Sequence, residues 1–144
     1  MKNLLFVFVP FSTPVSPPYS LTYLYQFVQQ NVSSDEFNLS VLDLNAKLHK
    51  HTFPNQYTLI KKALQKNNLS EYANYIKEVK KEFDAFGVKE NNQLHTSTIT
   101  DSIQFCLDMI LEQKPSVVLF SVVYNSQAFF ALTLSKLLKN QGVE

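Results

Sequence analysis

The sequence predicts an α/β fold of the Rossmann-like (flavodoxin-like) type, built on three parallel strands in the order 2-1-3. Three short apolar runs, at 3–9, 37–44 and 116–124, predict the strands, and stretches with helical spacing alternate with them. A strand, a helix and a second strand lie within about 45 residues. This βαβ unit implies parallel pairing through a right-handed crossover.

The first run, at 3–9, is continuously apolar and stops at Pro10, which is typical of a strand buried on both faces. A loop with four prolines follows over 10–20. The second run is expected to end as a strand near Asp43. Between the loop and this strand, helical spacing predicts a helix that ends near Val32 and carries Leu21, Leu24, Tyr25 and Val28.

Residues 46–113 predict a helical insert between the second and third strands. Its three helices are expected at 56–66, 70–86 and 100–113. The polar stretch at 89–98 predicts a loop. Small polar residues mark the starts of two helices, and glycine or proline marks their ends: Ser70 and Gly87 for the second helix, Thr100 or Asp101 and Pro115 for the third.

The run at 116–124 predicts the third strand, followed by a helix that Asn125 or Ser126 caps and Gly142 ends. A doubly wound domain normally has about five strands. We therefore expect residues 1–144 to be one truncated domain. The alternative is that two copies complete each other's sheets, since a bare edge beside the third strand favours pairing.

Composition excludes several classes of function. All 13 basic residues are lysines and balance 12 acidic ones, so arginine-based recognition of nucleic acid is absent. The two glycines cannot form a dinucleotide-binding GxGxxG, a P-loop or a hydrolase elbow. No apolar stretch is long enough to span a membrane, and a single cysteine excludes an internal disulfide. The expected location is cytoplasmic.

Histidine and cysteine do not predict a metal site. His49 and His51 are two residues apart and would not share a helix face, so we expect both in a surface loop. Cys106 lies on the apolar side of a predicted helix, where a buried thiol is the usual outcome. Tyr72, Tyr75, Phe83 and Phe86 have helical spacing and are expected in the core.

The binding site is expected beyond the carboxyl ends of the strands, where the strand order switches between the first and third. The residues expected to converge there are Ser12, Thr13, Ser121, Tyr124 and Asn125. They offer hydroxyls, an amide and an aromatic ring. With no cation nearby and only Asp43 to one side, this crevice suits a large, uncharged, partly apolar ligand and not a phosphate.

Four segments resemble a known family. They are VP at 9–10, PPYSLTYL at 17–24, VLDL at 41–44 and PSVVLFSVVYNSQ at 115–127. In order and spacing they resemble the N-terminal cobalamin-binding domain that precedes the catalytic barrel of cobalamin-dependent radical SAM enzymes. The resemblance covers 1–45 and 115–144, and the helical insert matches nothing in it.

The resemblance implies that this chain binds a corrin and presents it to a downstream catalytic barrel of the same polypeptide. That part of the parent protein would hold the iron–sulfur cluster (4Fe-4S), bind S-adenosylmethionine and carry out methyl transfer or another radical reaction. The residues it implies as cofactor contacts are Pro10, Phe11, Ser12, Thr13, Tyr19, Ser20, Asp43, Ser121, Val122, Tyr124, Asn125 and Gln127.

One departure from the family concerns the cobalt ligand. Better known cobalamin domains carry DxHxxG after the first strand, and its histidine ligates cobalt. Here PFSTP stands at 10–14, so the resemblance implies a corrin bound without a histidine ligand.

Structural explanations stay open beside the functional ones. The proline-rich loop could be a stiff connector, Asn125 a helix cap and Asp43 a solvated strand end. The competing function is a non-catalytic α/β interaction module that self-associates or binds a partner through the helical insert. A receiver-like phosphorylation domain would need an acidic pair after the first strand, which the sequence lacks.

Overall fold

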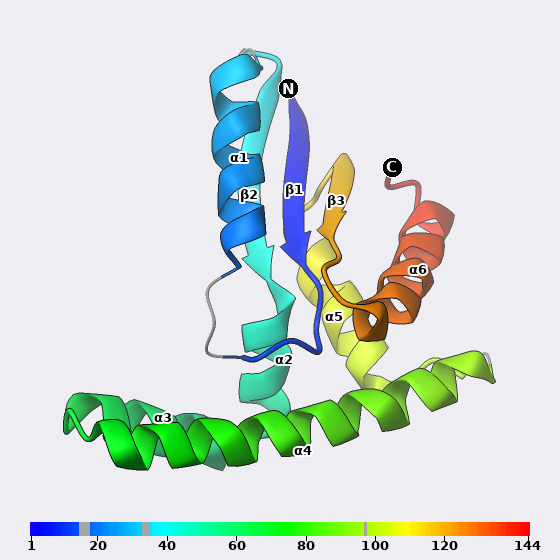
Figure 1. Ribbon diagram of the computed structural model, residues 1–144. Coiled ribbons are helices and arrows are strands. Elements are labelled where there is room, and N and C mark those ends of the chain that lie inside the picture. Colours follow the sequence, from blue (N-terminus) through cyan, green and yellow to red (C-terminus); the bar gives the residue numbers. More distant parts are fainter. Residues whose placement is uncertain (15–17, 33–34, 97) are drawn as a thin grey trace.

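Three parallel strands form the centre of the computed structural model: β1 (Lys2–Phe8), β2 (Phe37–Asp43) and β3 (Val117–Ser121) (Figure 1). The structure describes residues 1–14, 18–32, 35–96 and 98–144. β1 pairs with both neighbours, in the order β2-β1-β3. The predicted fold class and strand order are therefore confirmed. Part of the predicted proline-rich loop, including Pro17, lies outside the described residues.

Six helices surround the sheet in the described part of the chain. They are α1 (Tyr19–Asn31), α2 (Leu44–Thr52), α3 (Pro54–Gln65), α4 (Leu69–His95), α5 (Asp101–Leu111) and α6 (Asn125–Asn140). α1 covers one face of the sheet, and α5 and α6 lie on the other, while α4 runs across the carboxyl ends of the strands (Figure 1). Each helix in the described ranges is too short or too polar to span a bilayer.

The core has two parts because both faces of β1 are buried. Phe6 and Phe8 pack with Leu21 of α1 on one face. Leu5 and Val7 point to the other face and join the larger cluster with residues of α5 and α6. Alternate strand residues point to opposite faces, so the continuous apolar run of β1 fills both layers.

The helical insert differs from the prediction at α4. Asn68, not Ser70, caps this helix by accepting the Glu71 N–H at 3.1 Å. Gly87 does not end it, and the predicted loop at 89–98 is helical as far as His95. Tertiary contacts explain the extension, because Asn91 Nδ2 donates to the Ser126 carbonyl at 2.8 Å and Leu94 packs against the core.

A second difference is α2, a helix that the sequence did not predict. Asp43 starts it directly at the end of β2 by accepting the Ala46 N–H at 2.9 Å. The prediction of two surface-loop histidines is wrong, because both lie on α2 and His49 is buried. The helical periodicity of this segment is weak, because α2 has only nine residues and two of them are histidines.

β3 is shorter than predicted, and α6 begins differently. Val122 and Val123 lie beyond Ser121, the last residue of β3 to pair with β1. The cap of α6 is Tyr124 and not Asn125 or Ser126. The side chain of Gln127 reaches back and accepts the N–H of Tyr124 at 3.0 Å, which fixes this first turn. Thr100 caps α5 as predicted.

Candidate functional site

A cavity of about 320 Å³ opens at the carboxyl ends of β1 and β3, against α4. The residues that line it are Phe11, Ser12, Thr13, Lys80, Asp84, Gly87, Val88, Tyr124 and Ser126. Three of the predicted contact residues with polar groups, Ser12, Thr13 and Tyr124, thus come together here. The cavity lies where a parallel sheet places its ligands, at the switch between β1 and β3.

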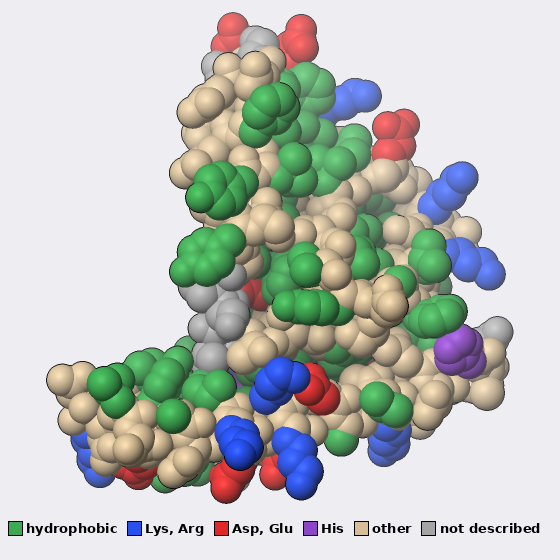
Figure 2. Space-filling view, viewed as in Figure 1, with side chains coloured by type: hydrophobic (Ala, Val, Ile, Leu, Met, Phe, Trp, Pro, Cys, Tyr) green, Lys and Arg blue, Asp and Glu red, His purple; other side chains and the backbone are tan. Residues whose placement is uncertain are grey.

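The cavity is charged, which corrects the prediction of a crevice without a cation. Lys80 and Asp84 of α4 form an ion pair at 2.5 Å on its wall, and both side chains are about half exposed. Figure 2 shows charged side chains gathered along α4, below the sheet. The i, i+4 spacing of Lys80 and Asp84 is visible in the sequence, but the crossing of α4 over the ends of the strands is not.

The segment after β1 divides between core and cavity. Pro10 and Phe11 are buried, and Phe11 packs edge-to-face on Phe130 at 5.1 Å between ring centroids. Phe11 adopts φ 77°, a left-handed conformation that is uncommon for a bulky residue. This turn sends the Phe11 ring into the core and leaves Ser12 and Thr13 partly exposed at the cavity, with the Ser12 N–H held by Asn45 Oδ1 at 3.0 Å.

The predicted residues on α1 lie beside the end of β3 and do not line the cavity. The Ser20 and Ser121 hydroxyl oxygens are 3.0 Å apart and hydrogen bond to each other. Tyr19 is 68% exposed. Ser20 and Ser121 are thus bonded to each other, while the side chain of Tyr19 is exposed to solvent.

Asp43 has a structural role at the start of α2. Its carboxylate accepts the Ala46 N–H, and burial raises its pKa, an effect that hydrogen bonds from the Ala46 and Asn45 backbones partly oppose. Asp43 does not line the cavity; its neighbour Asn45 is the residue that reaches Ser12. The alternative of a solvated strand end is therefore wrong, because the carboxylate is half-buried and bonded, and the predicted role of Asp43 as a cofactor contact stays a prediction.

The segment after β3 contains exposed residues and one buried residue whose side-chain hydrogen bonds are all made within the protein. Val122, Val123 and Tyr124 are 44%, 53% and 54% exposed, and Asn125 is exposed as well. Gln127 is fully buried, with its Nε2 donating to the Val9 carbonyl at 2.6 Å and its Oε1 accepting two backbone N–H groups. The side-chain amide of Gln127 thus holds the site together and is not available to a ligand.

The described residues contain no group of three or more metal-ligating side chains. His49 is buried against Phe53 and Phe83 and is not among the residues that line the cavity. Cys106 is buried, as predicted, and burial together with the nearby Glu90 raises its pKa well above the ordinary value. The thiol is therefore an inert part of the core.

A second cavity, of about 490 Å³, lies between α2, α4 and the start of α5. Glu90 lines it and is only 5% exposed, and its carboxylate accepts the Thr100 hydroxyl. The sequence prediction missed this cavity because it treated 89–98 as a loop. Glu90 and Thr100 serve the packing of α4 on α5.

The sequence matches no family model, and no curated protein or solved structure was found to be similar to it. The resemblance to cobalamin-binding domains stays a prediction that rests on its four short segments.

Proposed function

We propose that the carboxyl edge of this sheet binds a corrin cofactor, cobalamin, and presents it to a catalytic barrel downstream in a longer cytoplasmic protein. The observation that carries the proposal is the exposed apolar segment Val122–Tyr124 at the switch between β1 and β3. Exposed apolar groups that gather where parallel sheets generally bind their ligands favour a large apolar ligand.

The residues at this edge fit the chemistry of a corrin. The apolar segment, with Tyr19, can cover part of a large ring, and the hydroxyls of Ser12 and Thr13 can bond peripheral amides. The cavity takes only part of such a ligand, so most of the ring would lie on the edge. The described residues that line the cavity include no histidine, so the corrin would be held here without a cobalt ligand from a histidine.

The chain would contribute binding and orientation, while the corrin and a downstream iron–sulfur cluster with S-adenosylmethionine would supply the chemistry. The apolar segment would exclude water from the covered face. Lys80 and Asp84, being paired and half exposed, would stand at the rim, where either can bond an amide of the ligand.

The test is direct binding of hydroxocobalamin to the chain. Binding is measured by equilibrium dialysis and by the change in the visible absorbance of the cobalamin. Val123→Asp should weaken binding by about tenfold or more, since it places a charge where an apolar side chain would be buried. Leu132→Asp is the matched control, because Leu132 is similarly exposed, at 66%, but lies about two turns into α6, outside the segment Val122–Tyr124. Absence of binding, or equal weakening by both variants, would count against the proposal.

A second candidate function is a non-catalytic module that self-associates or binds a partner protein. One observation favours it: Tyr23 and Phe27 of α1 are 73% and 65% exposed. Neither residue belongs to the cavity at the carboxyl edge. A chain that does not bind hydroxocobalamin but binds a partner protein or a second copy of itself would support this second function.

A further inference from the structure

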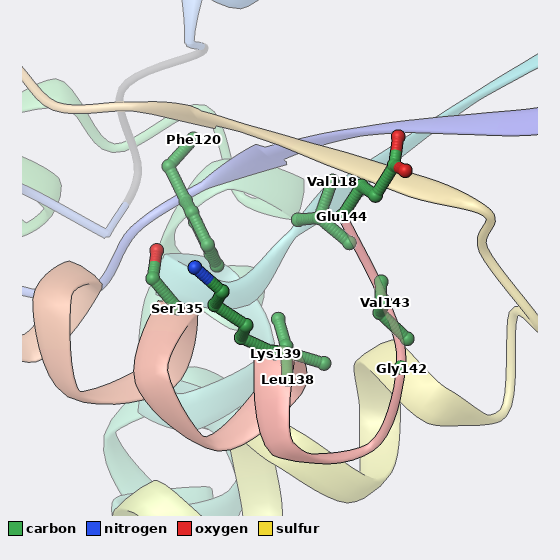
Figure 3. Close-up of a pocket in the computed structure, with 8 residues that line it drawn as sticks. All are labelled: Val118, Phe120, Ser135, Leu138, Lys139, Gly142, Val143 and Glu144. Carbon is green, nitrogen blue, oxygen red and sulfur yellow. The ribbon is translucent and has the colours of Figure 1, made fainter.

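The second cavity, of about 490 Å³, is formed within the helical insert. The residues that line it lie between His51 and Ser102, on α2, α4 and the start of α5. A further cavity, of about 480 Å³, lies between β3 and α6 and is walled in part by residues 142–144 (Figure 3). Glu144 pairs there with Ser116 at the start of β3, whereas α4 crosses the opposite, carboxyl ends of the strands (Figure 1). The second cavity is therefore built without the last residues of the chain.

Glu90 supplies a carboxylate to the second cavity, although this residue is only 5% exposed. Its Oε2 accepts the Thr100 hydroxyl. Among the described residues the other oxygen has no hydrogen-bond partner, and no cation pairs with the carboxylate. The free oxygen is not fully enclosed, so it can be reached from the cavity. Because a buried carboxylate is costly without a donor or a cation, this oxygen offers a strong acceptor to a positively charged ligand group.

The start of α5 brings hydrogen-bond donors to the same cavity. Thr100 connects them to Glu90, because its hydroxyl donates to the carboxylate and accepts the Ile103 N–H at 3.3 Å. Ser102 lines the cavity and is 8% exposed, and its hydroxyl has no partner in the described part of the chain. This hydroxyl lies in the first turn of α5, where free N–H groups and the helix dipole favour an anion. Lys89 adds a positive charge to the lining.

Apolar side chains and a second carboxylate complete the lining. Phe86 is half-buried and Ile99 is 54% exposed, while the His51 ring stacks on Phe105 at 4.2 Å between centroids. The second carboxylate is that of Asp101, which is exposed. A simple anion would meet two carboxylates here, and a simple amine would leave the donors of α5 unused. The lining therefore favours a ligand that carries an ammonium group, a carboxylate and an apolar side chain.

We propose that the second cavity binds a free α-amino acid with a large apolar or aromatic side chain. The ammonium group of the ligand bonds the free oxygen of Glu90, and its carboxylate accepts the Ser102 hydroxyl and first-turn N–H groups of α5. Phe86 and Ile99 contact the ligand side chain. Thr100 holds the two anchoring points next to each other, as an α-amino acid requires. The volume of about 490 Å³ lies within the range of small-molecule pockets.

The inference does not depend on corrin binding, and its test uses the whole chain. Binding of L-phenylalanine and L-leucine is measured by calorimetric titration, beside 3-phenylpropanoate, which lacks the ammonium group, and 2-phenylethylamine, which lacks the carboxylate. We expect saturable binding of at least one amino acid. Both analogues should bind at least about tenfold more weakly than phenylalanine, because each leaves a buried group without its partner. NMR shifts should appear at the amides of Asp101 and Ser102, and not at Ser12 and Thr13 of the proposed corrin site.

Two variants test the two anchoring points separately. Glu90→Gln keeps an acceptor for the Thr100 hydroxyl but removes the charge, and it should weaken amino-acid binding by about tenfold or more. Ser102→Ala removes the free hydroxyl and should weaken binding by about fivefold, with no partner lost inside the protein. Glu78→Gln makes the first change at an exposed position of α4 outside the cavity, so it should leave binding unchanged.

Several results would overturn the proposal. They are equal binding of 2-phenylethylamine, which would assign the cavity to amines, equal binding of 3-phenylpropanoate, which would assign it to anions, or no saturable binding of either amino acid. Unchanged binding in both Glu90→Gln and Ser102→Ala would also contradict it. Hydroxocobalamin absorbance measured on the same samples reports separately on the proposed corrin site, so each proposal can fail without the other.

Discussion

His49 shows how burial changes the role of a single residue. The ring is 2% exposed, lies stacked on Phe53 at 5.7 Å between centroids, and meets Phe83 edge-on. Burial lowers the pKa of His49 below 6.5, and the hydrogen bond with Gln56 opposes this only in part. Gln56 is held in turn by Glu82. The fold therefore stabilises the neutral imidazole.

Acid is expected to destabilise the protein through His49. The unfolded chain binds the proton at a higher pH than the folded one, so the free energy of unfolding falls as the pH drops below about 6.5 and levels off below the lowered pKa. His49→Leu should show a smaller fall between about pH 7.5 and about pH 5.5 in urea denaturation.

His51 provides the matched control for this measurement, because it is exposed on the same helix and stacks on Phe105. His51→Leu should retain the full fall in stability. If His49→Leu and the unchanged chain lose equal stability over this pH range, burial of His49 is not the cause.

Among the elements, β1 and α4 mark what the sequence could and could not predict. The apolar run of β1 ends at a proline, and burial on both faces follows from that composition alone. α4 is different, because its length and position depend on partners far away in the sequence. Asn91 reaches Ser126, and Gly87 contacts Phe11. Periodicity within a window contains no information on such contacts.

The candidate site likewise combines residues that the sequence predicts with residues that only the tertiary fold brings there. Ser12, Thr13 and Tyr124 were predicted because parallel strands bring their carboxyl ends together. Lys80 and Asp84 were missed because only the crossing of α4 brings them there. Gln127 was predicted as a contact, but the sequence could not show that its amide is used within the protein.

Gly87 tests the packing of α4 on the turn after β1. A Cβ atom at this position would lie 2.8 Å from both Cγ and Cδ1 of Phe11, which is buried among aromatic rings. Overpacking of this kind costs about 1–3 kcal/mol, while the better helix propensity of alanine returns at most about 1 kcal/mol. Gly87→Ala should therefore lower the free energy of unfolding by up to about 2 kcal/mol in urea denaturation.

A second background makes this prediction specific. In Phe11→Ala the obstructing ring is absent, so adding Gly87→Ala should stabilise the protein through helix propensity. The reversal of sign identifies the contact between residues 11 and 87. An equal loss of stability in both backgrounds would show that the helix itself does not tolerate the change.

Across the whole molecule, one buried amide joins the two sides of the proposed binding edge. Gln127 is fully buried on α6, donates to the Val9 carbonyl after β1, and accepts the N–H groups of Val123 and Tyr124 after β3. The ends of two strands and the start of a helix are thus connected through one side chain. Its loss should affect both stability and the shape of the carboxyl edge.

Gln127→Leu is expected to lower the free energy of unfolding by about 2–4 kcal/mol, because the buried Val9 carbonyl loses its donor and two N–H groups lose their acceptor. Gln127→Glu keeps an acceptor for the N–H groups but places a carboxylate at 2.6 Å from the Val9 carbonyl, so it should not restore stability. Gln104→Leu is the control, since Gln104 is exposed and its side chain bonds only Asp108 in the described structure. If Gln127→Leu and Gln104→Leu cost equally little in urea denaturation, the ends of β1 and β3 are held together by apolar packing alone.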